Sequence, residues 1–155
     1  MSVAFRRDSD EEHKEPRFEL PIPPGPNIVT PRGPSLIDQR IAALTAAQDG
    51  ADELRGAEIA RELRYWRTRR VTAVVAPPPP AGEIAIGSRV RFLLDGRERV
   101  IEIVGDDESD PASGRIAFSA PLARALIGAG AGECVAFNGR EDAITIVATE
   151  SGFTA

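Results

Sequence analysis

The sequence predicts an α+β protein in which an antiparallel helical hairpin, a short coiled coil, precedes a small antiparallel sheet domain with one short helix. Three observations predict this class. Apolar residues recur at helical spacing between residues 34 and 70, two hairpin-turn signals interrupt strand-like alternation after residue 84, and four successive prolines at 77–80 separate the two parts. At 155 residues, the chain has room for one ordinary domain and a smaller appendage.

Composition excludes several functional classes. The net charge of −5 and the pI near 5.0 argue against broad binding to nucleic acid, which needs a basic field, so we expect weak or no direct contact with it. The single cysteine, Cys134, fits a reducing cytoplasm and lies in an apolar run, where we expect a buried structural thiol. No apolar stretch has the length of a signal peptide core or a membrane span, so we expect a cytoplasmic protein.

The first segment, residues 1–26, is charged and then proline-rich, which predicts a disordered acidic tail without regular structure. His13 is the only histidine in the chain and has no second candidate ligand beside it. We therefore do not expect this segment to bind a metal ion.

A helical hairpin is predicted over residues 27–76. Its seam consists of apolar side chains spaced three or four residues apart, and the pairing of the two helices places the tip at residues 49–53. Gly50 provides the turn there, and Asp52 can cap the second helix. The seam residues are Ile37, Ile41 and Leu44 on the first helix and Ile59, Leu63 and Trp66 on the second.

The second helix also carries a row of arginines. We interpret it as a solvated outer face whose guanidinium groups pair with Glu58 and Glu62, in preference to a nucleic-acid patch. The arginines are Arg61, Arg64, Arg67, Arg69 and Arg70.

Residues 77–83 form a proline-rich linker, since four prolines cannot continue a helix and favour an extended spacer. The domain at 84–150 follows. Asp95-Gly96 and Asn138-Gly139 are each flanked by alternating apolar residues, which predicts two β-hairpins. Between them lie a short strand at 115–118 and a short helix at 121–127 that Pro121 opens.

No conventional catalytic set is present. The single histidine is remote from Cys134 in the sequence, and we find neither a metal-ligand cluster nor a phosphate-binding loop. The one group with chemical potential is the set of tip carboxylates, Asp49, Asp52 and Glu53. On an exposed turn, they could contribute to Mg²⁺ binding if another protein supplied the remaining oxygen ligands. We expect the chain to hold no metal or cofactor on its own.

Several stretches of the chain resemble the Gre transcript-cleavage factors of bacteria. In the C-terminal part these are residues 104–110, Val-Gly-Asp-Asp-Glu-Ser-Asp, residues 114–128 with the run Phe118-Ser119-Ala120-Pro121-Leu122, and Gly132-Glu133. In the N-terminal part, residues 27–33 are similar to the segment that precedes the first helix in that family, with Ile28 in place of an aromatic residue.

The resemblance implies an FKBP-like fold for residues 84–150 and a monomeric regulator that docks at the secondary channel of RNA polymerase, not an enzyme. The docking residues would be Ser119, Ala120, Pro121, Leu122 and Arg124. Asp49 and Asp52 have the three-residue spacing of the carboxylates that help the family hold a Mg²⁺ ion shared with the polymerase. The arm has about 14 residues from Ile37 to the tip, roughly 20 Å. It is shorter than in the cleavage factors and similar to the Rnk-type members, so we expect weak or no stimulation of cleavage.

Two alternatives remain open at this point. An FKBP-like fold is compatible with a peptidyl-prolyl isomerase, but such a pocket needs an aromatic floor, and from residue 84 onward the only aromatic residues are phenylalanines. The hairpin could also be a non-enzymatic interaction module that joins copies of the chain, although its seam of about two heptads is short for an intermolecular coiled coil.

Overall fold

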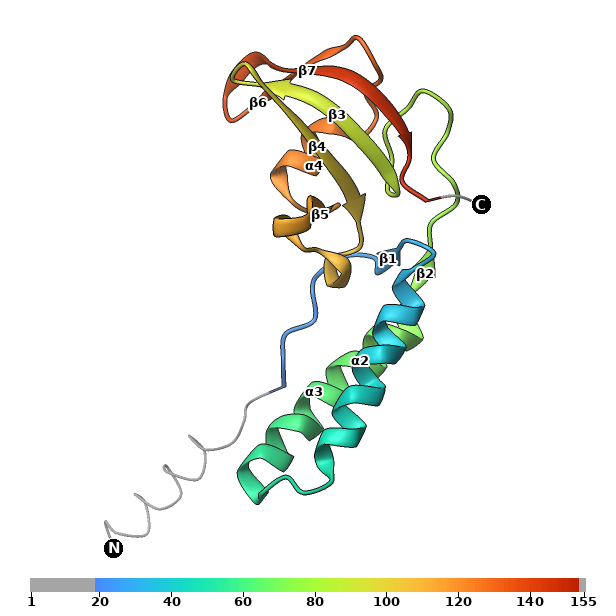
Figure 1. The fold of residues 1–155 in the computed structure, drawn as a ribbon, viewed down its shortest axis with the longest axis vertical. Coiled ribbons are helices and arrows are strands. Elements are labelled where there is room, and N and C mark those ends of the chain that lie inside the picture. The colour runs from blue at the N-terminus through green and yellow to red at the C-terminus, as the bar shows by residue number, and fades with distance from the viewer. Residues whose placement is uncertain (1–18, 154–155) are drawn as a thin grey trace, which may run out of the picture.

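The protein consists of a helical arm attached to the end of a sheet domain (Figure 1). The computed structural model describes residues 19–153. The α+β class is confirmed, with the two long helices in the N-terminal half of the chain and the sheet in the C-terminal half. The predicted disordered tail at 1–26 lies partly outside the described residues, as does His13. Residues 19–26 contain no helix or strand, and the Glu19 carboxylate pairs with Arg64 on the arm at 2.8 Å.

The arm is formed by α2 (Gly33–Gln48) and α3 (Glu53–Thr72), which run antiparallel. Ile37, Ile59 and Leu63 are buried in the seam, and the other predicted seam residues are half-buried. Gly50 has a φ of +83°, a conformation that favours glycine, and so makes the turn. Asp52 caps α3, because its Oδ1 accepts a hydrogen bond from the Arg55 backbone N–H at 2.8 Å.

Two short parallel strands close the base of the arm. They are β1 (Ile28–Val29), which precedes α2, and β2 (Val74–Val75), which follows α3. The Val74 N–H donates to the Asn27 carbonyl at 2.9 Å, and the Asn27 side-chain amide donates to the Arg69 carbonyl at 2.8 Å. These bonds fix both ends of the hairpin together where the chain passes to the sheet domain.

The sheet has the order β5-β4-β3-β7-β6 over the described residues. Both predicted hairpins are present, and their turns place Asp95, Gly96, Asn138 and Gly139 at positive φ. The bounds are β3 (Ser88–Leu94), β4 (Arg97–Val104), β5 (Arg115–Ala117), β6 (Cys134–Phe137) and β7 (Arg140–Ser151).

One strand departs from the antiparallel sheet that the sequence predicts. β5 pairs with β4 in parallel, with Ile103 opposite Ile116, so the sheet is mixed. The reason is the connection between the two strands. After β4 the chain passes through two single-turn helices, η1 (Asp106–Glu108) and η2 (Pro111–Ser113), and returns in the same direction.

The core of the sheet domain lies between the sheet and the helix α4 (Pro121–Leu126). Alternate residues of the central strands point toward it, as the period of two requires. The buried hydrophobic members are Ile84, Val90, Phe92, Ile101, Ile103, Ala123, Leu126, Ala129, Ile144 and Ile146.

Two expectations about single residues are wrong. Cys134 is exposed, because the alternation along β6 directs the neighbouring Val135 and Phe137 toward the core and Cys134 away from it. Arg69 does not belong to a solvated basic face: its side chain is 2% exposed and pairs with Asp107 of the sheet domain.

Among the described residues, no helix is long and apolar enough to cross a membrane.

Candidate functional site

The loop after β5 and the first turn of α4 contain all the residues that the sequence predicts as a docking surface. The Ser119 hydroxyl donates to the Asp106 carboxylate, which fixes the loop against η1. Ala120 precedes the helix without a side-chain cap, and Pro121 occupies the first helical position. Ser119, Pro121 and Arg124 are exposed, whereas Leu122 packs against the core. The surface therefore combines a hydroxyl, a rigid proline and a cation.

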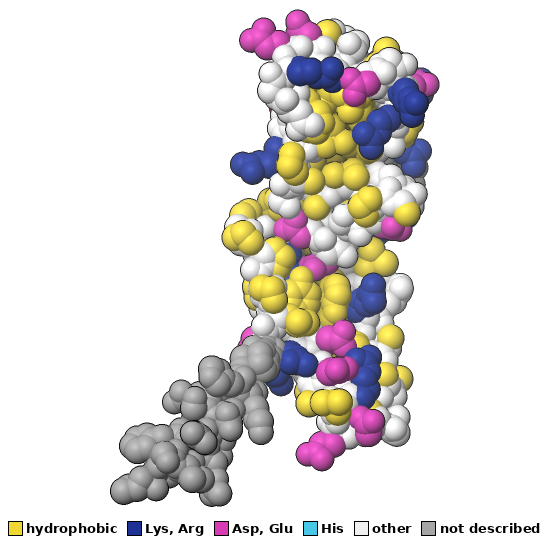
Figure 2. Space-filling view, turned by 90° about the vertical axis from the view of Figure 1, so that its left-hand side faces the viewer, with side chains coloured by type: hydrophobic (Ala, Val, Ile, Leu, Met, Phe, Trp, Pro, Cys, Tyr) yellow, Lys and Arg dark blue, Asp and Glu magenta, His cyan; other side chains and the backbone are white. Residues whose placement is uncertain are grey.

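An apolar region continues from this surface over the sheet domain. Figure 2 shows hydrophobic side chains gathered on this face of the domain with arginines near its margins. The side chains that pack on the core while remaining partly accessible come from several elements. They are Ile86, Leu94, Ile116, Phe118, Leu122, Val135 and Phe137. Such a region with a polar rim is typical of a protein–protein interface.

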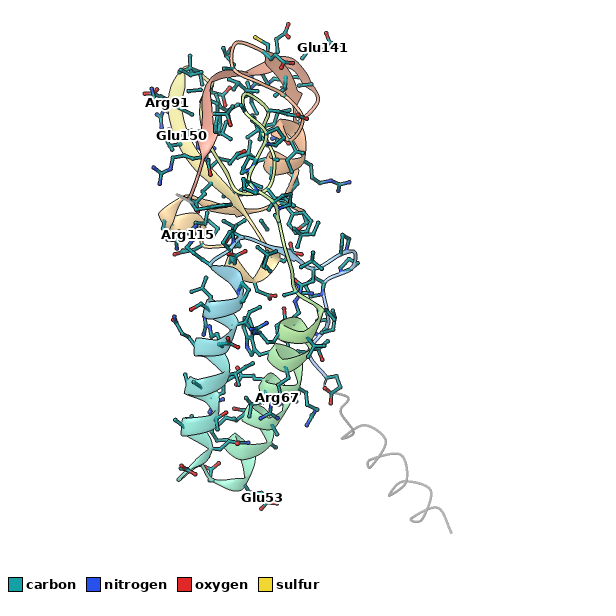
Figure 3. The ribbon with its side chains drawn as sticks, turned by 90° about the vertical axis from the view of Figure 1, so that its right-hand side faces the viewer. Glu53, Arg67, Arg91, Arg115, Glu141 and Glu150 are labelled. Atoms are coloured by element: carbon teal, nitrogen blue, oxygen red, sulfur yellow. The ribbon has the colours of Figure 1, made fainter. Side chains whose placement is uncertain are left out.

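The tip carboxylates lie at the far end of the arm, where Figure 3 shows Glu53. Asp49, Asp52 and Glu53 are all exposed. Asp52 is engaged as a helix cap, and Asp49 ends α2. Within residues 19–153, no three carboxylate, histidine or cysteine side chains are grouped so that they could hold a metal ion. The tip alone is therefore a capped, charged turn.

A second group of carboxylates is buried where the arm meets the sheet domain. Glu108 is 6% exposed and accepts hydrogen bonds from the Thr30 backbone N–H and the Gly105 N–H, both at 2.9 Å, and from the Thr30 hydroxyl. Glu102 of β4 pairs with Arg32, which directly precedes α2. Both contacts join the sheet domain to the start of the arm.

The neighbouring Asp107 joins the sheet domain to the second helix. Its carboxylate accepts from Arg69 Nε at 2.5 Å and from the Tyr65 hydroxyl, both on α3. Burial and the hydrogen bond to the Asp107 carboxylate raise the pKa of the Tyr65 phenol well above its ordinary value. The carboxylates of residues 102 and 108 therefore anchor the segment that leads into α2, and that of Asp107 anchors α3.

Sequence reasoning did not find this junction. Residues 106–108 match the family pattern without indicating a partner, and the spacing along the second helix predicts that Arg69 lies with the surface arginines. One signal in the sequence does indicate such a junction, namely an acidic run that directly follows a buried apolar strand. Residues at the end of a buried strand lie close to the element that packs against that end of the sheet.

Comparisons with known proteins identify the sheet domain. Residues 79–150 match the family described as "Transcription elongation factor, GreA/GreB, C-term". A transcription elongation factor GreB from Neisseria meningitidis is 40% identical over 100 residues, which cover 60% of this chain and 61% of that protein. A transcription elongation factor GreA from Brucella canis is 51% identical over 60 residues, which cover 34% of this chain and 38% of that protein.

The chain thus spans less than two thirds of the length of these relatives. Among solved structures, the GreA/GreB elongation factor from Nitrosomonas europaea is 20% identical, with 79% of this chain and 97% of that chain covered. Its TM-score is 0.39.

The structure is that of a protein with a helical arm set on one end of a sheet domain. Its sheet domain is similar to the C-terminal domain of the GreA/GreB transcription elongation factors.

Proposed function

We propose that the protein is a transcription elongation factor that binds bacterial RNA polymerase through its sheet domain, at the rim of the secondary channel, as a cytoplasmic monomer. The match of residues 79–150 to the family of GreA/GreB factors is the observation that carries the proposal. The exposed Ser119, Pro121 and Arg124, next to an apolar region of the same domain, form the contact surface. The isomerase alternative is not favoured, since the relatives are elongation factors.

The arm limits what the protein does once it is bound. α2 has 16 residues, which at 1.5 Å per residue gives an arm of about 24 Å. We propose that its tip does not reach far enough for Asp49 and Asp52 to hold a Mg²⁺ ion efficiently together with the polymerase. The protein would then occupy the channel with weak or no stimulation of RNA cleavage.

The docking surface is tested by measuring the affinity of the full chain for bacterial core RNA polymerase. We expect Pro121→Glu and Arg124→Glu each to weaken binding by about tenfold or more, which corresponds to roughly 1.4 kcal/mol. The matched control is Arg91→Glu, because Arg91 is also an exposed arginine and lies on β3, away from α4 (Figure 3). Equal affinity of all four proteins would refute this docking surface, and no binding by the unmodified chain would refute the function.

A further inference from the structure

A cleft of about 300 Å³ lies at the junction of the arm and the sheet domain. One wall is apolar and consists of Val29, Leu36, Ile37 and Trp66. The facing wall is polar and includes Arg115 of β5, with Ser109 and Asp110 from the connection before it. Arg40 of α2 completes the lining, and its guanidinium carbon lies 5.7 Å from the centre of a Trp66 ring. An apolar wall, two cations and the three carboxylates of Asp107, Glu108 and Asp110 thus share one small site.

Within the described part of the chain, the two arginines have no acidic partner, although the Arg40 guanidinium lies over the Trp66 ring in a cation–π contact. Over residues 19–153, the side chains of Arg40 and Arg115 have neither an ion pair nor a hydrogen bond. Figure 3 shows Arg115 beside the start of α2, at the level of the junction. Of the carboxylates in the lining, Asp107 pairs with Arg69 and Glu108 accepts hydrogen bonds from Thr30, and neither forms an ion pair with Arg40 or Arg115.

Asp110 gives the site an acceptor as well. Its carboxylate accepts a hydrogen bond from the Ser113 hydroxyl, and in the described part of the chain it has no cationic partner. It lies in the same lining as the arginines. The cleft therefore offers a stacking surface, positive charge for an anion, and a carboxylate for the N–H groups of a ligand.

We propose that this cleft binds a purine mononucleotide. The base would lie along Trp66 and Leu36, its N–H edge would donate to Asp110, and the phosphate would be held by Arg40 and Arg115, since guanidinium groups match phosphate oxygens. The volume is at the lower end of the range for small-molecule sites, which is about 300–1,000 Å³, so it suits one nucleotide and not a dinucleotide. Because Arg40 belongs to the arm and Arg115 to the sheet, the ligand bridges the two.

Trp66 is the only tryptophan in the chain, so its fluorescence reports directly on the cleft. The full chain is titrated with GMP, AMP, CMP, guanosine and inorganic phosphate, and equilibrium dialysis measures binding independently. We expect saturable quenching by GMP or AMP below about 1 mM, with CMP, guanosine and phosphate at least about tenfold weaker. No polymerase is present, so the outcome is independent of the proposed function.

Variants of the residues that line the cleft test whether the nucleotide binds there. Arg115→Gln should weaken nucleotide binding by about tenfold at an unchanged melting temperature, because its side chain has no partner to lose. Arg67→Gln is the matched control, an exposed arginine of α3 that lies outside the lining (Figure 3). Asp110→Asn should weaken GMP binding, because a neutral amide oxygen replaces the carboxylate that accepts from the base.

Three results would overturn the proposal. The first is no saturable signal from either purine nucleotide, and the second is phosphate binding as tightly as GMP, which would mean a simple anion site. The third is an equal loss of affinity in Arg115→Gln and Arg67→Gln, which would mean attraction to the surface as a whole.

Discussion

The molecule carries two groups of carboxylates in opposite situations, one at the tip of the arm and one at its base. Asp49, Asp52 and Glu53 at the tip are in solvent, and only Asp52 has a structural task. At the base, Asp107 accepts from Arg69 and Tyr65 of α3, and Glu108 accepts from Thr30 in the segment that precedes α2. The difference teaches that the partner of a carboxylate, and not its residue type, decides its role. The base group anchors the arm, and the tip group is exposed at the far end of it.

The largest expected effect comes from Asp107→Ala. It leaves the Arg69 guanidinium, which is 2% exposed, without its counter-ion, so the free energy of unfolding should fall by about 3–5 kcal/mol. Urea unfolding measures it. The matched control is Asp38→Ala, because Asp38 also pairs with an arginine of α3, Arg70, but at the surface. Its loss should stay below about 1 kcal/mol. Similar losses of unfolding free energy in the two variants would show that the buried ion pair at the base of the arm contributes no more than a surface ion pair.

Glu108→Ala should have the next largest effect. It removes the acceptor of two buried backbone N–H groups and of the Thr30 hydroxyl, so we expect a loss of about 2–3 kcal/mol. The same unfolding measurement on Glu141→Ala, which changes an exposed glutamate (Figure 3), should show a change within about 0.5 kcal/mol. A Glu108→Ala protein as stable as the Glu141→Ala protein would contradict the role given to the base carboxylates.

Two of the tip carboxylates differ in their structural role, because Asp52 caps α3 and Asp49 does not cap a helix N-terminus. Asp52→Ala removes the cap of α3 and should cost about 1 kcal/mol, whereas Asp49→Ala should change stability by no more than about 0.5 kcal/mol. Thermal unfolding of the two variants checks this. If Asp49→Ala were the more destabilising, the tip would contain a contact that the structure does not show.

The smallest effect is a pH dependence from Tyr65, the only tyrosine in the chain. Burial and Asp107 raise its pKa in the folded state, so the neutral phenol stabilises the fold fully below about pH 10, the ordinary value, and this contribution is lost as the pH rises above it. The stability of the wild type relative to Tyr65→Phe should therefore decline between about pH 9 and about pH 11. Urea unfolding at several pH values measures it. Parallel curves for the two proteins would show that Tyr65 is not held at the junction.

Local patterns predicted most of the fold, because they rest on residues close together in the chain. The two Asx-Gly turns, the cap at Asp52 and the seam at Ile37, Ile59 and Leu63 are of this kind. The parallel pairing of β5 and the burial of Arg69 depend on contacts between distant segments, which periodicity does not record. The cleft also depends on contacts between distant segments, because its walls come from both the arm and the sheet domain. The docking residues were located by family pattern, and their contact with a polymerase stays a prediction.

The central claim is that the sheet domain occupies the family's place on RNA polymerase while the short arm does little there. A competition assay tests it most directly: a backtracked elongation complex is supplied with a cleavage-competent Gre factor and increasing amounts of this chain. We predict that the chain lowers RNA cleavage in proportion to its concentration, supports little cleavage alone, and loses the effect in Pro121→Glu. Cleavage that continues unchanged at saturating chain would contradict the claim.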